Sequence, residues 1–363
     1  MCNSNIKGPK ILYLSRGRGF SHAMYDSLIM RELKKINKNI SILVASYDKG
    51  YSYFVNNEIK AFSLGLKQDE ELTLKAGFRM WSLIRRFKPD LVVTDEVFIV
   101  LHITKALKIP SVLITHWFFE NFNKKHPMIP VVKKANHVVF VDAPEFHTIP
   151  FDFNVHLTCV GPVIRDFKYT LENKERARKE LGINLRDKVI LVTPGGRHKD
   201  RSKLLEVSLT AFKELKGDNL KLILLAGELC KEYSKRYEGD ERIIVKDFDW
   251  EMDRLMVASD LVICKGTFMT TWEIAYLGVP SISIPDIDHI DQFHVNRMVD
   301  HGFTKKIDPR KLRKKVLLEK IKETLYNDRE KENISKEVKK FISGRGQKDA
   351  AEEINYLANK TIK

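Results

Sequence analysis

The chain has 363 residues, of which 43% are apolar and 31% charged, so it can bury hydrophobic cores and is not a disordered protein. At this length we expect two domains of about 150 to 200 residues each. The formal net charge of +15 suits anionic partners such as nucleotides, nucleic acid or acidic lipid, although a lysine-rich solvated surface would give the same excess.

The four cysteines lie far apart without a C-x-x-C pair, which suggests neither a zinc knuckle nor a disulfide framework and fits a reducing cytoplasm. Residues 1–10 lack an apolar signal core, and no apolar run approaches the roughly 18 residues of a membrane span. We therefore expect a cytoplasmic protein that would meet a membrane only from its surface.

Short apolar runs alternate with longer amphipathic stretches, which is the pattern of repeated β-α units. In the first half we expect helices at 21–35 and 72–87 and strands at 10–14, 41–45, 91–94, 111–115 and 137–141. In the second half we expect strands at 189–193, 220–226, 242–245, 261–264 and 281–284. Near-continuous apolar strands imply parallel sheets covered on both faces. The predicted fold class is α/β, with two Rossmann-like doubly wound domains in tandem.

A break in regular structure separates the two halves. Gly161 and Pro162 interrupt the stretch CVGPVIRDF at 159–167, just before a charged helix expected at 171–181. We place the N-terminal domain at 1–164 and the C-terminal domain at 165–363. This division allows the last helix to pack back on the N-terminal domain.

The turn after the first predicted strand reads LSRGRGFSHAMYD, residues 14–26. Gly17 and Gly19 occupy the first two positions of a G-x-G-x-x-G dinucleotide fingerprint, and His22 occupies the third. A histidine there obstructs close helix–strand packing, which disfavours an NAD-dependent oxidoreductase that would use Asp48 for the ribose. At the end of a parallel strand, His22 is a candidate functional residue, with a packed or helix-capping histidine as the alternative.

A second motif, DLVICKGTFMTTWEIAYLGVPSISIP at 260–285, predicts a strand, a small-residue turn, a helix and another strand. The helix would begin near Gly266 and Thr267, where free backbone N–H groups and the positive dipole end form an anion site that fits a diphosphate. Thr270 adds a hydroxyl donor and Lys265 adds charge. Glu273 follows about two turns into the helix, where it would accept both ribose hydroxyls; an ordinary solvated glutamate is the alternative.

The next predicted helix opens with PDIDHIDQFHVN, residues 285–296, which is rich in groups that hydrogen-bond sugar hydroxyls. Asp291 and Gln292 are best placed for this near its start. A metal site built from Asp288, His289, Asp291 and His294 would match no ligand spacing that we can defend. We expect no metal and no dissociable cofactor.

These motifs resemble, in order and over nearly the whole chain, those of the GT-B fold glycosyltransferases. The likeness is strongest to the group containing the lipid-intermediate N-acetylglucosaminyltransferase of peptidoglycan synthesis. The matching segments are SRGRGFSH, KPDLVVTDE, IPSVLITHWFFE, CVGPVIRDF, ILVTPGGR, the 260–285 motif and DQFHVN. The sequence departs from the family pattern at two places, with Ser21 in place of a glycine and Gly266-Thr267 in place of Ser-Gly. These departures leave the identity of the acceptor undetermined.

The resemblance implies a donor site in the C-terminal domain. Glu273 would bind the ribose, Phe248 would lie near the base, Arg165 near the diphosphate, and Asp291 with Gln292 would face the donor sugar. The nucleotide and phosphate residues implied are Arg165, Gly195, Gly196, Phe248, Lys265, Gly266, Thr267, Phe268, Thr270 and Glu273.

The resemblance also implies a role for His22 on the acceptor side. Transfer of a sugar with inversion needs a base, and imidazole, with a reference pKa of about 6.5, is matched to neutral pH. Asp95 would orient the ring, with Glu96 and His116 as competing candidates. The acceptor-side residues implied are Gly17, Gly19, Ser21 and His116.

The activity implied is an inverting, metal-independent transfer from a UDP-sugar, of an N-acetylhexosamine or hexose, to a hydroxyl of a glycan or lipid-linked acceptor. A UDP-sugar epimerase of the same fold is the alternative. A basic nucleic-acid or lectin-like module is less favoured because no RNA-recognition or helix-turn-helix signature is present, and we expect no nucleic-acid partner. The basic, aromatic stretch at 74–90 could rest on anionic lipid at the inner face of the cell membrane, although core packing explains its apolar residues equally well.

Overall fold

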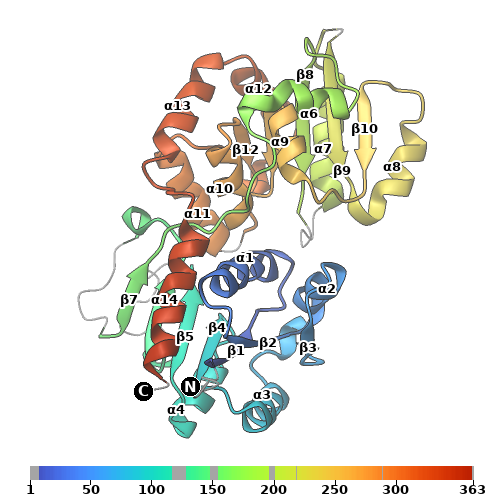
Figure 1. The fold of residues 1–363 in the computed structure, drawn as a ribbon. Coiled ribbons are helices and arrows are strands. Elements are labelled where there is room, and N and C mark those ends of the chain that lie inside the picture. Colours follow the sequence, from blue (N-terminus) through green and yellow to red (C-terminus); the bar gives the residue numbers. More distant parts are fainter. Residues whose placement is uncertain are drawn as a thin grey trace. The chain divides into compact units, whose positions relative to one another are not determined.

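The computed structural model describes residues 8–116, 128–147, 154–195, 201–217, 219–287 and 289–361. The chain divides into two compact units (Figure 1). Unit 1 comprises Met1–Ile164 together with Ile342–Lys363, and unit 2 comprises Arg165–Phe341. Each unit contains one parallel sheet with helices packed against it, which confirms the predicted α/β class.

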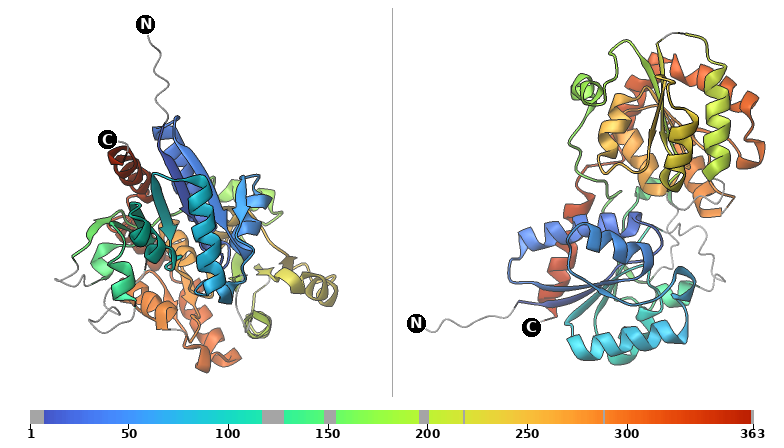
Figure 2. Two further views of the ribbon diagram at one scale, coloured as in Figure 1. Left: turned by 90° about the horizontal axis from the view of Figure 1, so that it is seen from below. Right: turned by 90° about the vertical axis from the view of Figure 1, so that its right-hand side faces the viewer.

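The sheet of unit 1 has seven parallel strands in the order β3-β2-β1-β4-β5-β6-β7. Its strands are β1 Lys10–Leu14, β2 Ser41–Ser46, β3 Ala61–Ser63, β4 Leu91–Asp95, β5 Ser111–Thr115, β6 His137–Phe140 and β7 His156–Cys159. Its helices are α1 Ser21–Ile36, α2 Asp48–Asn56, α3 Leu74–Phe87, α4 Val100–Leu107, α5 Ile129–Val132 and α14 Gly346–Lys360. Helices cover both faces of this sheet (Figure 2).

The sheet of unit 2 has six parallel strands in the order β10-β9-β8-β11-β12-β13. Its strands are β8 Lys188–Thr193, β9 Leu220–Leu225, β10 Ile243–Lys246, β11 Leu261–Cys264, β12 Ser281–Ser283 and β13 Lys305–Lys306. Its helices are α6 Lys174–Glu180, α7 Arg201–Lys213, α8 Cys230–Arg236, α9 Met252–Ala258, α10 Phe268–Tyr276, α11 His289–Asp300, α12 Lys314–Leu325 and α13 Asp328–Val338.

Central strands are the part of each sheet that the sequence predicts well. β4, β5 and β11 are buried at every position, because in a doubly covered parallel sheet both faces of a strand contact apolar side chains. The short edge strands β3 and β13 and the half-exposed β7 were not predicted, since an edge strand needs no continuous apolar run.

Two predicted helices differ at their ends. The helix expected from residue 72 begins at Leu74, because the Thr73 hydroxyl accepts a hydrogen bond from the backbone N–H of Ala76 and caps it. The helix expected at 171–181 is instead a 3₁₀ turn, Leu171–Asn173, followed by α6. Among the helices in the described ranges, none is long and apolar enough to cross a membrane.

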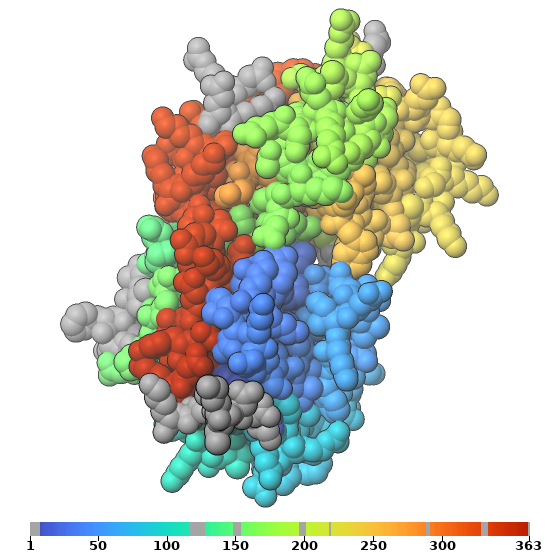
Figure 3. Space-filling view, in the orientation of Figure 1, coloured from blue at the N-terminus to red at the C-terminus, as the bar shows by residue number. Residues whose placement is uncertain are grey.

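The last helix, α14, belongs to unit 1 and packs along α1 (Figure 3). Its buried face is mostly small, with Gly346, Ala350 and Ala351, so the backbones approach closely. A side chain at position 346 would come within 2.6 Å of the Pro162 carbonyl oxygen. α14 therefore supports α1, the helix that carries His22.

Candidate active site

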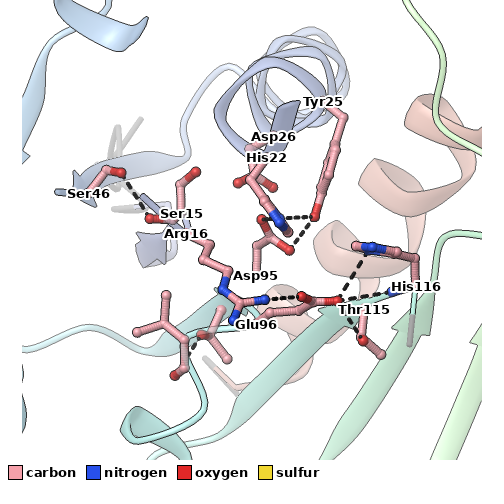
Figure 4. Close-up of polar contacts among 12 residues, drawn as sticks. Ser15, Arg16, His22, Tyr25, Asp26, Ser46, Asp95, Glu96, Thr115 and His116 are labelled. Carbon is pink, nitrogen blue, oxygen red and sulfur yellow. Dashed lines mark hydrogen bonds and ion pairs between the residues drawn. The ribbon is translucent and has the colours of Figure 1, made fainter. Parts of the chain in front are cut away.

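The carboxyl end of β4 and the start of α1 bring His22 and Asp95 together (Figure 4). The Nδ1 atom of His22 lies 2.6 Å from Oδ2 of Asp95, and the two residues are 9% and 0% exposed. Because the carboxylate accepts the hydrogen bond, Nδ1 carries the proton and Nε2 is left as the basic nitrogen. Within the described part of the chain, Nε2 has no hydrogen-bond partner.

Two further residues of α1 contact this pair (Figure 4). The Tyr25 hydroxyl donates a short hydrogen bond to Oδ1 of Asp95 and lies 2.8 Å from Nδ1 of His22. Asp26 is fully buried and accepts a 2.8 Å hydrogen bond from the Tyr13 hydroxyl. Burial, and then the charge of Asp95, raise the pKa of Asp26 well above its ordinary value. Neither residue was predicted from the sequence, although Tyr25 follows His22 at helical i,i+3 spacing.

Glu96, the first competitor for orienting His22, is engaged elsewhere. Nη1 of Arg16 lies 2.6 Å from Oε2 of Glu96, and Nη2 lies 2.8 Å from Oε1 of Glu71. Glu71 also pairs with Arg18 at 2.9 Å. Burial alone would lower the pKa of Arg16, but the charges of Glu96 and Glu71 outweigh it and the net direction is upward. The two arginines of the turn are therefore neutralised inside unit 1.

His116, the second competitor, lies at the carboxyl end of β5 beside His22. Its Nδ1 is 3.2 Å from Oε1 of Glu96, and its ring centroid is 5.7 Å from that of His22. Burial lowers the pKa of His116 and outweighs the opposing charge of Glu96, so His116 is a neutral imidazole at neutral pH.

The two glycines of the turn have structural reasons of their own. A side chain on Gly17 would come within 2.3 Å of the Tyr47 carbonyl oxygen, and Gly19 has a φ of 80°. Ser21, the first residue of α1, is exposed. A direct role of these residues toward an acceptor stays a prediction.

In unit 2, the turn between β11 and α10 has the form of an anion site. The helix begins at Phe268, one residue later than Thr267, which is the N-cap residue. Gly266 has a φ of 78°, and a side chain there would come within 2.7 Å of Val295. The Thr267 hydroxyl donates to that of Thr270 at 3.1 Å. The backbone N–H groups of the first turn are therefore presented at the helix N-terminus.

Glu273 is not a solvated helix glutamate, and that interpretation was wrong. It is 1% exposed, and both of its oxygens accept hydrogen bonds from Arg165: Nε to Oε1 at 2.7 Å and Nη2 to Oε2 at 3.0 Å. The Arg165 side chain is 18% exposed and so covers the carboxylate. Nη1 of Arg165 lies 3.5 Å from the Trp250 carbonyl oxygen, and the Trp250 ring packs edge-on against exposed Phe248 at 4.6 Å.

Lys265 is buried, and its ammonium group is paired within the turn. Its Nζ forms an ion pair with Asp286 and lies 4.0 Å from Oδ2 of Asp291. The Gln292 side chain donates to the Asp286 carbonyl oxygen at 2.8 Å. Gly195, with a φ of 72°, lies next to the Lys265 side chain. These residues are neighbours, and their role in a donor site stays a prediction.

The predictions about Gly196 and about a metal site can be compared with the structure only in part. Gly196 lies outside the described residues. No group of three or more histidine, cysteine, aspartate or glutamate side chains that could hold a metal ion occurs within the ranges that the structure describes.

Comparisons with known proteins identify related sequences and similar folds. Residues 189–354 match the model of the glycosyltransferase family 28 C-terminal domain. The MurG structure from Acinetobacter baumannii superposes with a TM-score of 0.69 at 16% identity, covering 97% of this chain and 99% of that one. A UDP-GlcNAc 2-epimerase from Neisseria meningitidis has the same fold, with a TM-score of 0.63 at 17% identity over 97% and 99% of the chains. The protein is a glycosyltransferase of the GT-B fold, which confirms the class expected from the sequence.

The likeness extends to a particular group of enzymes. A relative from Bacillus cereus is 23% identical over 374 residues, covering 96% of this chain and 99% of its own. It is a UDP-N-acetylglucosamine–N-acetylmuramyl-(pentapeptide) pyrophosphoryl-undecaprenol N-acetylglucosamine transferase. The resemblance to the lipid-intermediate transferases is thereby confirmed across nearly the whole length of the chain.

Proposed function

We propose that the protein transfers a sugar, an N-acetylhexosamine or a hexose, from a UDP-sugar to a hydroxyl group of a glycan or lipid-linked acceptor. Unit 1 would bind the acceptor, and unit 2, Arg165–Phe341, would bind the donor. The relative's name pairs UDP-N-acetylglucosamine with a pyrophosphoryl-undecaprenol acceptor, which supports both substrate classes. The observation that carries the proposal is the orientation of His22 by Asp95.

In the proposed reaction His22 is the general base. Its Nε2 takes the proton of the acceptor hydroxyl while the acceptor oxygen forms a bond to the anomeric carbon of the sugar. The bond from that carbon to the diphosphate oxygen breaks in the same step, so the configuration inverts and UDP leaves. Asp95 stabilises the imidazolium that forms, because its carboxylate accepts the Nδ1 hydrogen bond.

The leaving diphosphate needs donors directed at its developing charge. The N-terminus of α10 and the guanidinium of Arg165 would supply them, with Lys265 holding the turn through its ion pair with Asp286. Asp291 and Gln292 would face the donor sugar, and Phe248 the base. This set of donors supports a reaction that needs no metal ion.

The pairing of Arg165 with Glu273 adds a step to donor binding. Glu273 is almost fully buried beneath Arg165, so ribose hydroxyls would reach its carboxylate only when the guanidinium moves aside. The displaced guanidinium would then be available to the diphosphate. Nucleotide binding would therefore replace the Arg165–Glu273 ion pair with two new contacts, one from Arg165 to the diphosphate and one from Glu273 to the ribose.

Helix α3 supports a contact with a membrane surface. Ala76, Met80, Leu83 and Ile84 form its buried face, so core packing does not account for its exposed apolar residues. Leu74, Phe78 and Trp81 are 93%, 68% and 42% exposed. Arg85 and Arg86 in the last turn add positive charge, and anionic lipid attracts a helix of this kind. The protein would then lie at the inner face of the cell membrane.

Replacing His22 tests the proposed base. His22→Ala should lower kcat for sugar transfer by about 10²- to 10⁴-fold and leave UDP affinity unchanged, because the imidazole acts only on the acceptor hydroxyl. UDP release is measured with a panel of UDP-sugars and a lipid-linked acceptor, and UDP affinity by calorimetry. His102→Ala, an exposed histidine of α4, is the matched control and should retain full activity.

Two results would contradict this proposal. Full transfer by the His22→Ala protein would remove the base from the mechanism. Interconversion of two UDP-sugars without transfer, or binding of NADH in place of UDP, would assign the protein to a different reaction.

Replacing Arg165 tests whether its guanidinium leaves Glu273 and binds the diphosphate when the nucleotide binds. Arg165→Ala should bind UDP about tenfold or more weakly, since a charged partner of the diphosphate is lost, but should bind uridine more tightly, since Glu273 is already exposed. Calorimetry with both ligands measures the two effects. Arg254→Ala, which removes an ion-paired arginine of similar exposure, should change neither affinity. Equal weakening of UDP and uridine by Arg165→Ala would show that Arg165 only orients Glu273.

Vesicle binding tests the role of α3. Leu74→Ser should weaken sedimentation with phosphatidylglycerol vesicles roughly tenfold, because an apolar side chain is lost from the lipid contact. Leu185→Ser, an exposed leucine of unit 2, should not weaken it. Equal behaviour of the two variants would place the membrane contact elsewhere.

A further inference from the structure

Tyr25 contacts both members of the His22–Asp95 pair. It follows His22 by one turn of α1 and is 2% exposed. Its hydroxyl is 2.8 Å from Nδ1 of His22 and donates a short hydrogen bond to Oδ1 of Asp95 (Figure 4). Each oxygen of the Asp95 carboxylate therefore has its own donor: Oδ2 has the imidazole and Oδ1 has the phenol.

Two donors on one carboxylate fix its orientation. A carboxylate held by a single hydrogen bond can rotate about its side-chain bonds, whereas a second donor on the other oxygen sets the plane of the group. Asp95 is completely buried, so bulk solvent does not reach it to supply that second donor. If residue 25 served only to fill space in the core, phenylalanine would suffice. The hydroxyl group of Tyr25 adds the hydrogen bond to Asp95.

The surroundings keep the phenol a donor. Burial, and then the charge of Asp95, raise the pKa of Tyr25 well above its ordinary value, so its proton stays in place at neutral pH. Burial and the charge of Asp95 also raise the pKa of Asp26, the next residue, which disfavours a second negative charge in the cluster. The other titratable groups that face the cluster are Tyr13 from β1, Glu96 from the end of β4 and His116 from the end of β5.

We propose that Tyr25 is a positioning residue for the general base: its hydroxyl holds Asp95 so that Oδ2 receives Nδ1–H of His22 and Nε2 faces the acceptor. The inference rests on the proposed function, because it assigns the part that Tyr25 plays in the same proton transfer. It also explains why three residues of one helical segment, His22, Tyr25 and Asp26, lie in a single buried cluster with Asp95.

Removing the hydroxyl group alone tests this role. Tyr25→Phe should lower kcat about tenfold or more and leave the KM for the UDP-sugar unchanged, because the variant loses a hydrogen bond to a charged group and keeps the ring. The acid limb of the kcat/KM profile should also move to lower pH. Without the phenol, the Asp95 carboxylate is no longer held in place beneath Nδ1, so it stabilises the protonated imidazole less.

A matched tyrosine in the same unit provides the control. Tyr53→Phe removes the hydroxyl of a buried tyrosine on α2 that contacts Ser27 at 3.4 Å, and it should alter neither kcat nor the pH profile. The pH midpoint does not depend on the fraction of folded enzyme, so partial unfolding of Tyr25→Phe would not imitate the effect. UDP affinity and the thermal unfolding midpoint report the fold independently.

The outcomes separate the two claims. A pH profile and kcat of Tyr25→Phe that match the wild type would overturn the positioning role and leave the proposed function intact. If Tyr25→Phe loses activity by the same factor at every pH, Tyr25 acts through packing, and the inference is overturned as well. A wild-type protein that transfers no sugar would contradict the proposed function, and the positioning role with it.

Discussion

The hydrogen bond between His22 and Asp95 depends on the parallel pairing of two neighbouring strands. β1 pairs with β4 in the register that sets Leu14 beside Thr94, so the chain leaves β1 level with the position of Asp95. The turn then brings His22 over the end of β4. Gly17 is required there because its backbone touches Tyr47. Since both partners are buried, the hydrophobic core of unit 1 determines where Nε2 points.

Internal ion pairs set the charges available to a ligand. In unit 1, Arg16 and Arg18 are neutralised by Glu71 and Glu96, and in unit 2 Lys265 is paired with Asp286. The formal charge of +15 therefore says little about either half of the proposed site, because the basic side chains expected to attract substrate already have carboxylate partners. In our account, a diphosphate gains a cation when Arg165 leaves Glu273, and the helix N-terminus supplies the remaining donors.

The sequence predicted features that depend on local pattern and edge geometry. His22 was a candidate because it follows a parallel strand, where folds of this class bind ligands, and the family resemblance implied Asp95 as its partner. Tyr25 was recoverable from its helical spacing and was overlooked. The pairs Arg16–Glu71 and Arg165–Glu273 were not predictable, since 55 and 108 residues separate the partners and no periodicity links them. Edge strands escaped prediction because solvent covers part of each.

The tautomer of His22 is the most direct test of the proposed base. Nitrogen-15 NMR of histidine-labelled protein resolves the two ring nitrogens, and His22→Ala assigns the signal among the eleven histidines. Our account predicts that the neutral imidazole of His22 carries its proton on Nδ1, and that Asp95→Asn disturbs this tautomer. A proton fixed on Nε2, or a signal that Asp95→Asn leaves unchanged, would contradict the assignment of His22 as a base oriented by Asp95.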